Sequence, residues 1–115
     1  MKKLFFILIL LISNTSLKAQ DAAAPVTFFG QCMVQMSNEA EASAVEAQMR
    51  TNPNIRVIRL DFASQRAFVL TQGIEQLTEA QFASWFLQYQ DKLSCIQIGV
   101  DGVDERKPFP FTDCD

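Results

Sequence analysis

The order in which two kinds of apolar pattern follow one another constrains the fold most strongly. Residues 27–36, 55–62, 66–71 and 93–100 are rich in β-forming residues, and apolar side chains alternate along much of them. Residues 39–50 and the segment after Thr78 space their apolar residues three or four apart, as amphipathic helices do. The sequence therefore predicts the order strand, helix, strand, strand, helix, strand.

The connections indicate how these strands pair. Residues 63–65 alone separate the second strand from the third, so these two form an antiparallel hairpin. Each helix is long enough to carry the chain back across the sheet, and such crossovers are right-handed. We therefore expect an α+β protein with a ferredoxin-like βαββαβ sandwich, a four-stranded antiparallel sheet with two helices on one face. A β-grasp or another α+β fold is the alternative.

Capping residues predict where the helices begin and end. Ser37 or Asn38 caps the first helix, and Asn38 with Glu41 resembles a capping box. Thr78 caps the second, and Pro53 lies in the turn that ends the first. The residues expected to face the sheet are Ala42, Val45 and Met49 in the first helix and Phe82, Phe86 and Tyr89 in the second.

The first 19 residues have the layout of a cleavable secretory signal. Lys2 and Lys3 precede an unbroken apolar run at positions 4–12, and a short polar stretch ends at Ala19. Nine apolar residues rise only about 14 Å as a helix, about half of a hydrocarbon core, so a permanent membrane anchor is not expected. The predicted organisation is a signal peptide (1–19), a flexible lead-in (20–26), one domain (27–100) and an irregular C-terminal tail (101–115). We expect an exported protein, periplasmic or secreted.

Charge limits the partners. Lys2, Lys3 and Lys18 leave with the signal, so 10 basic residues become 7 against 13 acidic ones, and the net charge changes from −3 to −6. An acidic chain gains nothing from the counterion release that drives nucleic-acid binding. An anionic membrane surface would repel it. No nucleic acid and no membrane is therefore expected as a partner of the processed chain.

The three cysteines matter because disulfides persist in oxidising compartments. In the predicted sheet, Cys32 points towards the helices and Cys95 points away, so these two cannot bond without distortion. Cys114 lies in a tail long enough to fold back. A disulfide between Cys95 and Cys114 is one candidate, and free thiols or a bridge between two molecules through Cys114 are the others.

Part of the chain resembles a known family. Residues 52–62, Asn-Pro-Asn-Ile-Arg-Val-Ile-Arg-Leu-Asp-Phe, with Arg66-Ala-Phe-Val and Leu77-Thr-Glu-Ala-Gln-Phe, are similar to the heavy-metal-associated domain family. The resemblance covers about residues 27–100 and implies the fold expected above. Family members hold a soft metal with a Cys-x-x-Cys pair after the first strand. Here the matching stretch, residues 36–42, has no cysteine, so metal transfer does not carry over.

A rearranged soft-metal site is the alternative function. Thiolate and thioether ligands suit Cu(I), and Cys32 and Met36 share a face of the first strand. They lie four residues apart, about 13 Å along a strand, and both residue types are common in cores. We therefore interpret both as core residues and expect no cofactor.

The face of the sheet away from the helices is predicted to be apolar. Such a face meets water unless something covers it. Two occupants are open: a protein partner or second copy, which would make the patch an interface, or the C-terminal tail, through Phe109 and Phe111. The residues expected there are Phe29, Met33, Phe68 and Leu70.

Catalysis is not expected. The chain has no histidine, which is the commonest general base. Its acidic residues crowd the starts of the helices, where they favour the helix dipole. The expected function is that of an exported, non-catalytic interaction or structural module.

Overall fold

The computed structural model describes residues 26–112 and residue 114. The predicted signal peptide and nearly all of the lead-in lie outside these residues. The elements are β1 (Phe28–Val34), α2 (Glu39–Met49), β2 (Ile55–Asp61), β3 (Arg66–Thr71), α3 (Glu79–Ser84), the 3₁₀ helix η1 (Leu87–Lys92) and β4 (Leu93–Val100). No helix among the described residues is long and apolar enough to cross a membrane.

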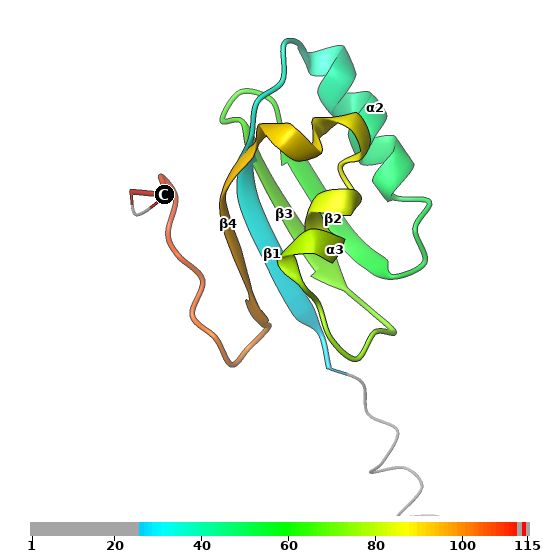
Figure 1. The fold of residues 1–115 in the computed structure, drawn as a ribbon, viewed down its shortest axis with the longest axis vertical. Helices are drawn as coiled ribbons and strands as arrows, with labels where there is room; N and C mark the ends of the chain where they lie inside the picture. Colours follow the sequence, from blue (N-terminus) through cyan, green and yellow to red (C-terminus); the bar gives the residue numbers. More distant parts are fainter. Residues whose placement is uncertain (1–25, 113, 115) are drawn as a thin grey trace, which may run out of the picture.

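The four strands form one antiparallel sheet in the order β2-β3-β1-β4 (Figure 1). The predicted α+β class and four-stranded antiparallel sheet are therefore confirmed. β2 and β3 form the expected hairpin, with Asp61 opposite Arg66. β1 lies in the centre, with β3 on one side and β4 on the other, so side chains from distant parts of the sequence stand beside it.

Both helical segments contribute to one hydrophobic core on one face of the sheet. Val45 and Met49 of α2 and Phe82 of α3 are buried in the same cluster as Cys32 and Val69 from the sheet. The even-numbered residues of β1 face this cluster, because strand side chains alternate between faces. The opposite side of the sheet, called the open face from here on, is left to other parts of the chain.

The caps explain where the helices begin. The Asn38 side chain accepts a hydrogen bond from the backbone N–H of Glu41 at 2.9 Å, and that of Thr78 accepts one from the N–H of Gln81 at 3.1 Å. The Glu41 carboxylate in turn accepts a hydrogen bond at 2.8 Å from the backbone N–H of Ser37, not from that of Asn38. Asn38 is therefore the cap, and the reciprocal bond reaches one residue further back than in a capping box.

The second helical segment is broken, where the sequence predicts one helix. α3 ends at Ser84, and Leu87 has a positive φ of 58° before the chain continues as η1. Phe86 and Tyr89 are still buried. The spacing of Phe82, Phe86 and Tyr89 predicted their burial correctly, but the chain reaches it through a left-handed turn at Leu87.

β4 contains one extra residue relative to β1. Gln31 is opposite Gln97 and Met33 is opposite Ser94, so two steps along β1 match three along β4. Cys95 lies in this bulge with a φ of 56°. The bulge shifts the alternation, so that Leu93, Ile96 and Ile98 all pack against the core.

The ring of Phe82 from α3 packs directly against Gly30 of β1. A Cβ atom at this position would lie 2.5 Å from two ring carbons of Phe82, whose side chain is fully buried. We expect Gly30→Ala to lower the free energy of unfolding by about 1–3 kcal/mol, the usual cost of overpacking. Urea unfolding of the oxidised protein measures it.

Phe82→Leu provides the matched background, because leucine lacks the outer ring carbons. The cost of Gly30→Ala should be smaller there than in the parent chain. An equal cost in both backgrounds would show that the ring contact is not the cause.

Candidate functional site: the open face and the tail

The open face presents three rows of side chains that run across the four strands. Residues directly opposite one another on neighbouring strands stand side by side on one face. From β2 through β3 and β1 to β4, the rows are Val57, Leu70, Phe29 and Gly99; Arg59, Phe68, Gln31 and Gln97; and Asp61, Arg66, Met33 and Ser94. The face therefore changes from apolar in the first row to mixed and charged in the other two.

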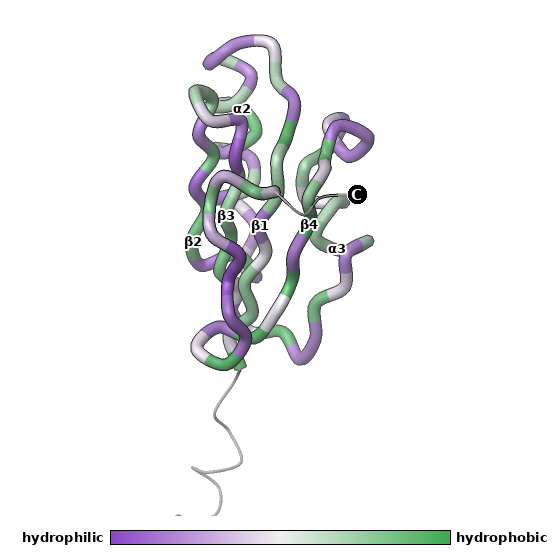
Figure 2. The backbone as a smooth tube through the Cα atoms, turned by 90° about the vertical axis from the view of Figure 1, so that its left-hand side faces the viewer, coloured by the Kyte–Doolittle hydropathy of each residue, from purple (hydrophilic) through white to green (hydrophobic). Residues whose placement is uncertain are grey.

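The segment after β4, residues 101–112 and Cys114, is called the tail. It contains no helix or strand and runs back alongside the sheet, with α3 on the other side of β4 (Figure 2). Hydrogen bonds from two glutamine side chains hold its backbone. Gln97 accepts from the N–H of Lys107 at 2.8 Å and donates to the carbonyl of Glu105 at 2.9 Å. The side-chain amide of Gln97 thus both accepts from and donates to the tail backbone, as the backbone of a neighbouring strand does.

Gln31 supports this docking from beneath. Its Nε2 donates to Oε1 of Gln97 at 2.7 Å and to the carbonyl oxygen of Lys107 at 3.0 Å. The side chain is fully buried, and a buried amide is costly unless it is paired. The tail therefore supplies a partner that the sheet alone would not give.

Arginine side chains lie on aromatic rings where the tail crosses the face. The guanidinium carbon of Arg106 is 4.6 Å from the ring centroid of Phe68 and 5.8 Å from that of Phe29. Arg106 also pairs with Asp101 at 2.7 Å. On the other side, the guanidinium carbon of Arg66 is 5.1 Å from the ring centroid of Phe109. These ring contacts are cation–π interactions, and they restrict the movement of the Arg66 and Arg106 side chains.

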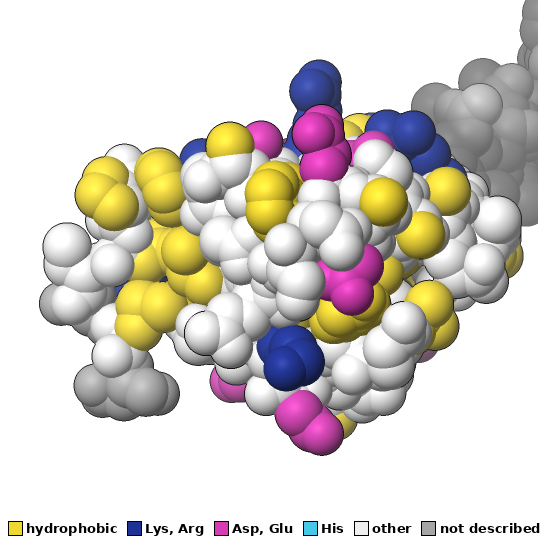
Figure 3. All heavy atoms as spheres, turned by 90° about the horizontal axis from the view of Figure 1, so that it is seen from above, with side chains coloured by type: hydrophobic (Ala, Val, Ile, Leu, Met, Phe, Trp, Pro, Cys, Tyr) yellow, Lys and Arg dark blue, Asp and Glu magenta, His cyan; other side chains and the backbone are white. Residues whose placement is uncertain are grey.

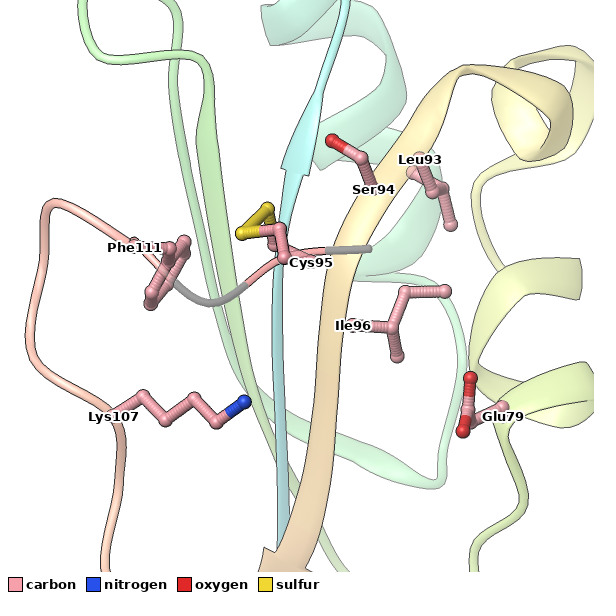
Figure 4. Close-up of a pocket in the computed structure, with 8 residues that line it drawn as sticks. Glu79, Leu93, Ser94, Cys95, Ile96, Lys107 and Phe111 are labelled. Atoms are coloured by element: carbon pink, nitrogen blue, oxygen red, sulfur yellow. A yellow bond between two sulfur atoms is a disulfide. The ribbon is translucent and has the colours of Figure 1, made fainter.

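A disulfide joins the end of the tail to β4. Cys95 and Cys114 are bonded, with their Cα atoms 4.6 Å apart, so the predicted pairing is present. Figure 4 shows why the bulge matters: Leu93 and Ile96 point towards the helices, whereas Cys95 points towards the tail. The sequence reasoning predicted this direction for Cys95 but not the bulge, which brings Leu93 to the core side.

The tail divides the predicted apolar patch. Phe29 is fully buried, and Met33, Phe68 and Leu70 are half-buried. Cover by the tail was one of the two predicted occupants, but the group that lies on Phe29 and Phe68 is the Arg106 guanidinium rather than a phenylalanine ring. Phe109 remains 40 % exposed. Hydrophobic side chains gather at the end of the molecule next to the last residues of the tail (Figure 3).

A hollow of about 310 Å³ remains beside the tail, over β2 and β3. We call it the arginine groove, and it is lined by Arg59, Asp61, Ser64, Arg66, Phe68 and Arg106. The hydroxyl of Ser64 donates to the Asp61 carboxylate at 2.6 Å, and this bond above all lowers the pKa of Asp61. The groove therefore contains three cations and one carboxylate that stays ionised.

Cys32 lies in the hydrophobic core, and Met36 packs against the same cluster. Cys32 is fully buried, and burial raises the pKa of its thiol to about 12, which favours the protonated form. No group of three or more potential His, Cys, Asp or Glu ligands gathers among the residues that the structure describes. Cys32 is thus a core residue, as interpreted from the sequence.

Another hollow borders the segment between β1 and α2. Met36, Glu41, Tyr89 and Lys92 are among the residues that line a hollow of about 420 Å³. Desolvation raises the pKa of the Tyr89 phenol, and the hydrogen bond and negative charge of Glu41 raise it further. A carboxylate and a neutral phenol therefore line this hollow.

Sequence reasoning missed Gln31, Gln97 and the three arginines of the groove. Gln31 and Gln97 alternate with apolar residues in their strands, which gave the right face but no reason to single them out. Arg59 and Arg66 likewise occupy the polar positions of β2 and β3. The signal that was available is that Arg59 and Arg66 fall on one face of an acidic chain once the strands are paired; strand pairing does not place Arg106, which lies in the tail.

No protein-family model, curated protein or solved structure matches this chain.

The disulfide generates a direct prediction. Cys114→Ser should lower the free energy of unfolding by about 3 kcal/mol, because the bridge closes a short loop in the unfolded chain. Urea unfolding with and without a reducing agent measures this. The reductant should destabilise the parent protein by a similar amount and leave Cys114→Ser unchanged; equal stability of variant and parent would contradict the assignment.

The buried Cys32 thiol should affect both the pH dependence of stability and the rate of alkylation. A buried neutral thiol contributes stability below its unfolded-state pKa near 9.0, and this contribution is lost as the pH rises from about 9 to about 12. At pH 8.5 we expect alkylation of Cys32 in the folded protein to be at least about a hundredfold slower than in urea. Mass spectrometry of the unreduced protein follows the alkylation of Cys32. Cys95 and Cys114 serve as the internal control, because disulfide-bonded cysteines are not alkylated. Equal rates would contradict the buried position.

Proposed function

We propose that this chain is an exported, non-catalytic interaction module with a ferredoxin-like βαββαβ fold of the heavy-metal-associated type. The order of its elements, the sheet order β2-β3-β1-β4 and one core shared by both helical segments support that fold. The Cys95–Cys114 bridge supports export, because disulfides persist where the surroundings are oxidising.

The observation that carries the proposal is the tail bonded across the open face. It buries Phe29 and fixes Arg106 but leaves the arginine groove uncovered. Side chains that are held rigid before a partner arrives lose less freedom on binding, which favours recognition. The partner or second copy expected on this face therefore binds beside the tail, against Phe68 and Leu70.

The alternative function, soft-metal binding, has less support. Cysteine binds Cu(I) as the thiolate, and burial keeps the Cys32 thiol protonated. Copper titration of the reduced protein separates the two functions, since tight stoichiometric uptake that Cys32→Ala abolishes belongs to the alternative alone.

Photo-crosslinking in the cells that produce the protein tests the proposed function. A photoreactive phenylalanine derivative replaces Leu70 on the open face, and in a control chain it replaces the exposed Ser43 on α2. We expect a discrete adduct with an exported protein, or with a second copy, from position 70 and none from position 43. No adduct from position 70, or the same adducts from both positions, would overturn the proposal.

A further inference from the structure

The arginine groove differs in charge from the rest of the molecule. The chain is acidic, with a net charge of −3, yet Arg59, Arg66 and Arg106 line one hollow on the open face. The three arginines come from β2, β3 and the tail, so the pairing of the strands and the docking of the tail bring them together.

Two of the three guanidinium groups have hydrogen-bonding capacity left. Nε of Arg66 is buried and has no hydrogen-bond partner among the described residues. Arg59 is exposed, and within the described part of the chain it makes neither an ion pair nor a side-chain hydrogen bond. The donor geometry of a guanidinium group matches an anion with two oxygens, so the unused donors of Arg59 and Arg66 favour such an anion.

Aromatic rings hold Arg66 and Arg106 in place. Arg66 lies against Phe109 and Phe111, with its guanidinium carbon 5.1 and 5.9 Å from their ring centroids. Arg106 lies 4.6 Å from the Phe68 centroid. Arginines stacked in this way lose little freedom when a ligand binds, so the groove is prepared for an anion.

We propose that the arginine groove binds a carboxylate group on an acidic segment of a protein partner. This rests on the proposed function and names the chemistry of the partner. Asp61 stays ionised in the groove, which disfavours a doubly charged phosphate more than a singly charged carboxylate. The neighbouring tail offers an apolar contact, since Phe109, which lies against Arg66, is 40 % exposed. An acidic residue flanked by apolar ones therefore fits this surface.

Titration of the oxidised protein with short peptides, followed by ¹H–¹⁵N NMR, tests the proposal. The probe is acetyl-Ala-Leu-Asp-Leu-Ala-amide, and the matched peptide carries Asn in place of Asp. Glutarate and inorganic phosphate at equal ionic strength are the small-molecule arms. We expect saturable shifts with the Asp peptide, centred on Arg59, Ser64 and Arg66, and binding at least about tenfold weaker with the Asn peptide.

The variants separate the groove from general charge effects. Arg59→Gln should weaken binding of the Asp peptide about tenfold or more, whereas Arg56→Gln, the same charge change on the same strand but outside the groove, should not. Because Arg59 is exposed, its replacement leaves the fold intact, and the NMR spectrum checks this.

Four results would overturn the proposal: no saturable shift, equal binding of the Asn peptide, equal loss in Arg56→Gln, or binding of phosphate or glutarate as tight as that of the Asp peptide. The crosslinking result from position 70 is independent of these. An adduct there with a failed titration would leave the interaction module standing and remove only its acidic partner.

Discussion

The extra residue in β4 is the constraint on which the open face depends. Without it, strict alternation would place Leu93 and Ile96 on opposite sides of the sheet, and one of them would leave the core. The bulge lets both pack inward, while Cys95 keeps the outward direction that alternation with Ile96 and Ile98 gives it. From that position Cys95 bonds Cys114, which holds the tail along the face. The strand thus completes the core with Leu93 and Ile96 and anchors the tail through Cys95.

Glutamine side chains provide the second level of this arrangement. A fully buried Gln31 in the centre of a sheet face is unfavourable by itself, because desolvating an amide costs free energy that only hydrogen bonds return. Gln97 and the tail backbone accept two such bonds from Nε2 of Gln31, whereas its Oε1 has no partner among the described residues. The polar middle row is therefore covered by an extended chain, whose backbone groups hydrogen-bond to the glutamines. An apolar row could be covered by any apolar surface. The same docking places Arg106 on Phe29 and Phe68.

The sequence predicted those features that depend on local chemistry. Alternation placed Cys32 in the core, and capping chemistry placed the helix starts at Ser37 or Asn38 and at Thr78, with Asn38 the cap that forms. The direction of Cys95 made its pairing with Cys114 one of the candidates, and that pairing is present. The sequence did not predict the positive φ at Cys95 or Leu87, since neither residue type prefers that conformation and tertiary packing imposes it. The arginine groove was equally hidden, because its members come from three segments that only the fold brings together.

The tail is docked on the open face and held there by the disulfide. Amide hydrogen exchange at Lys107, whose N–H donates to Gln97 at 2.8 Å, tests this most directly. In the oxidised protein we expect this amide to exchange much more slowly than in an unstructured peptide of the same sequence, and in Cys114→Ser we expect most of that protection to be lost. Exchange at the peptide rate in the oxidised protein would contradict the account.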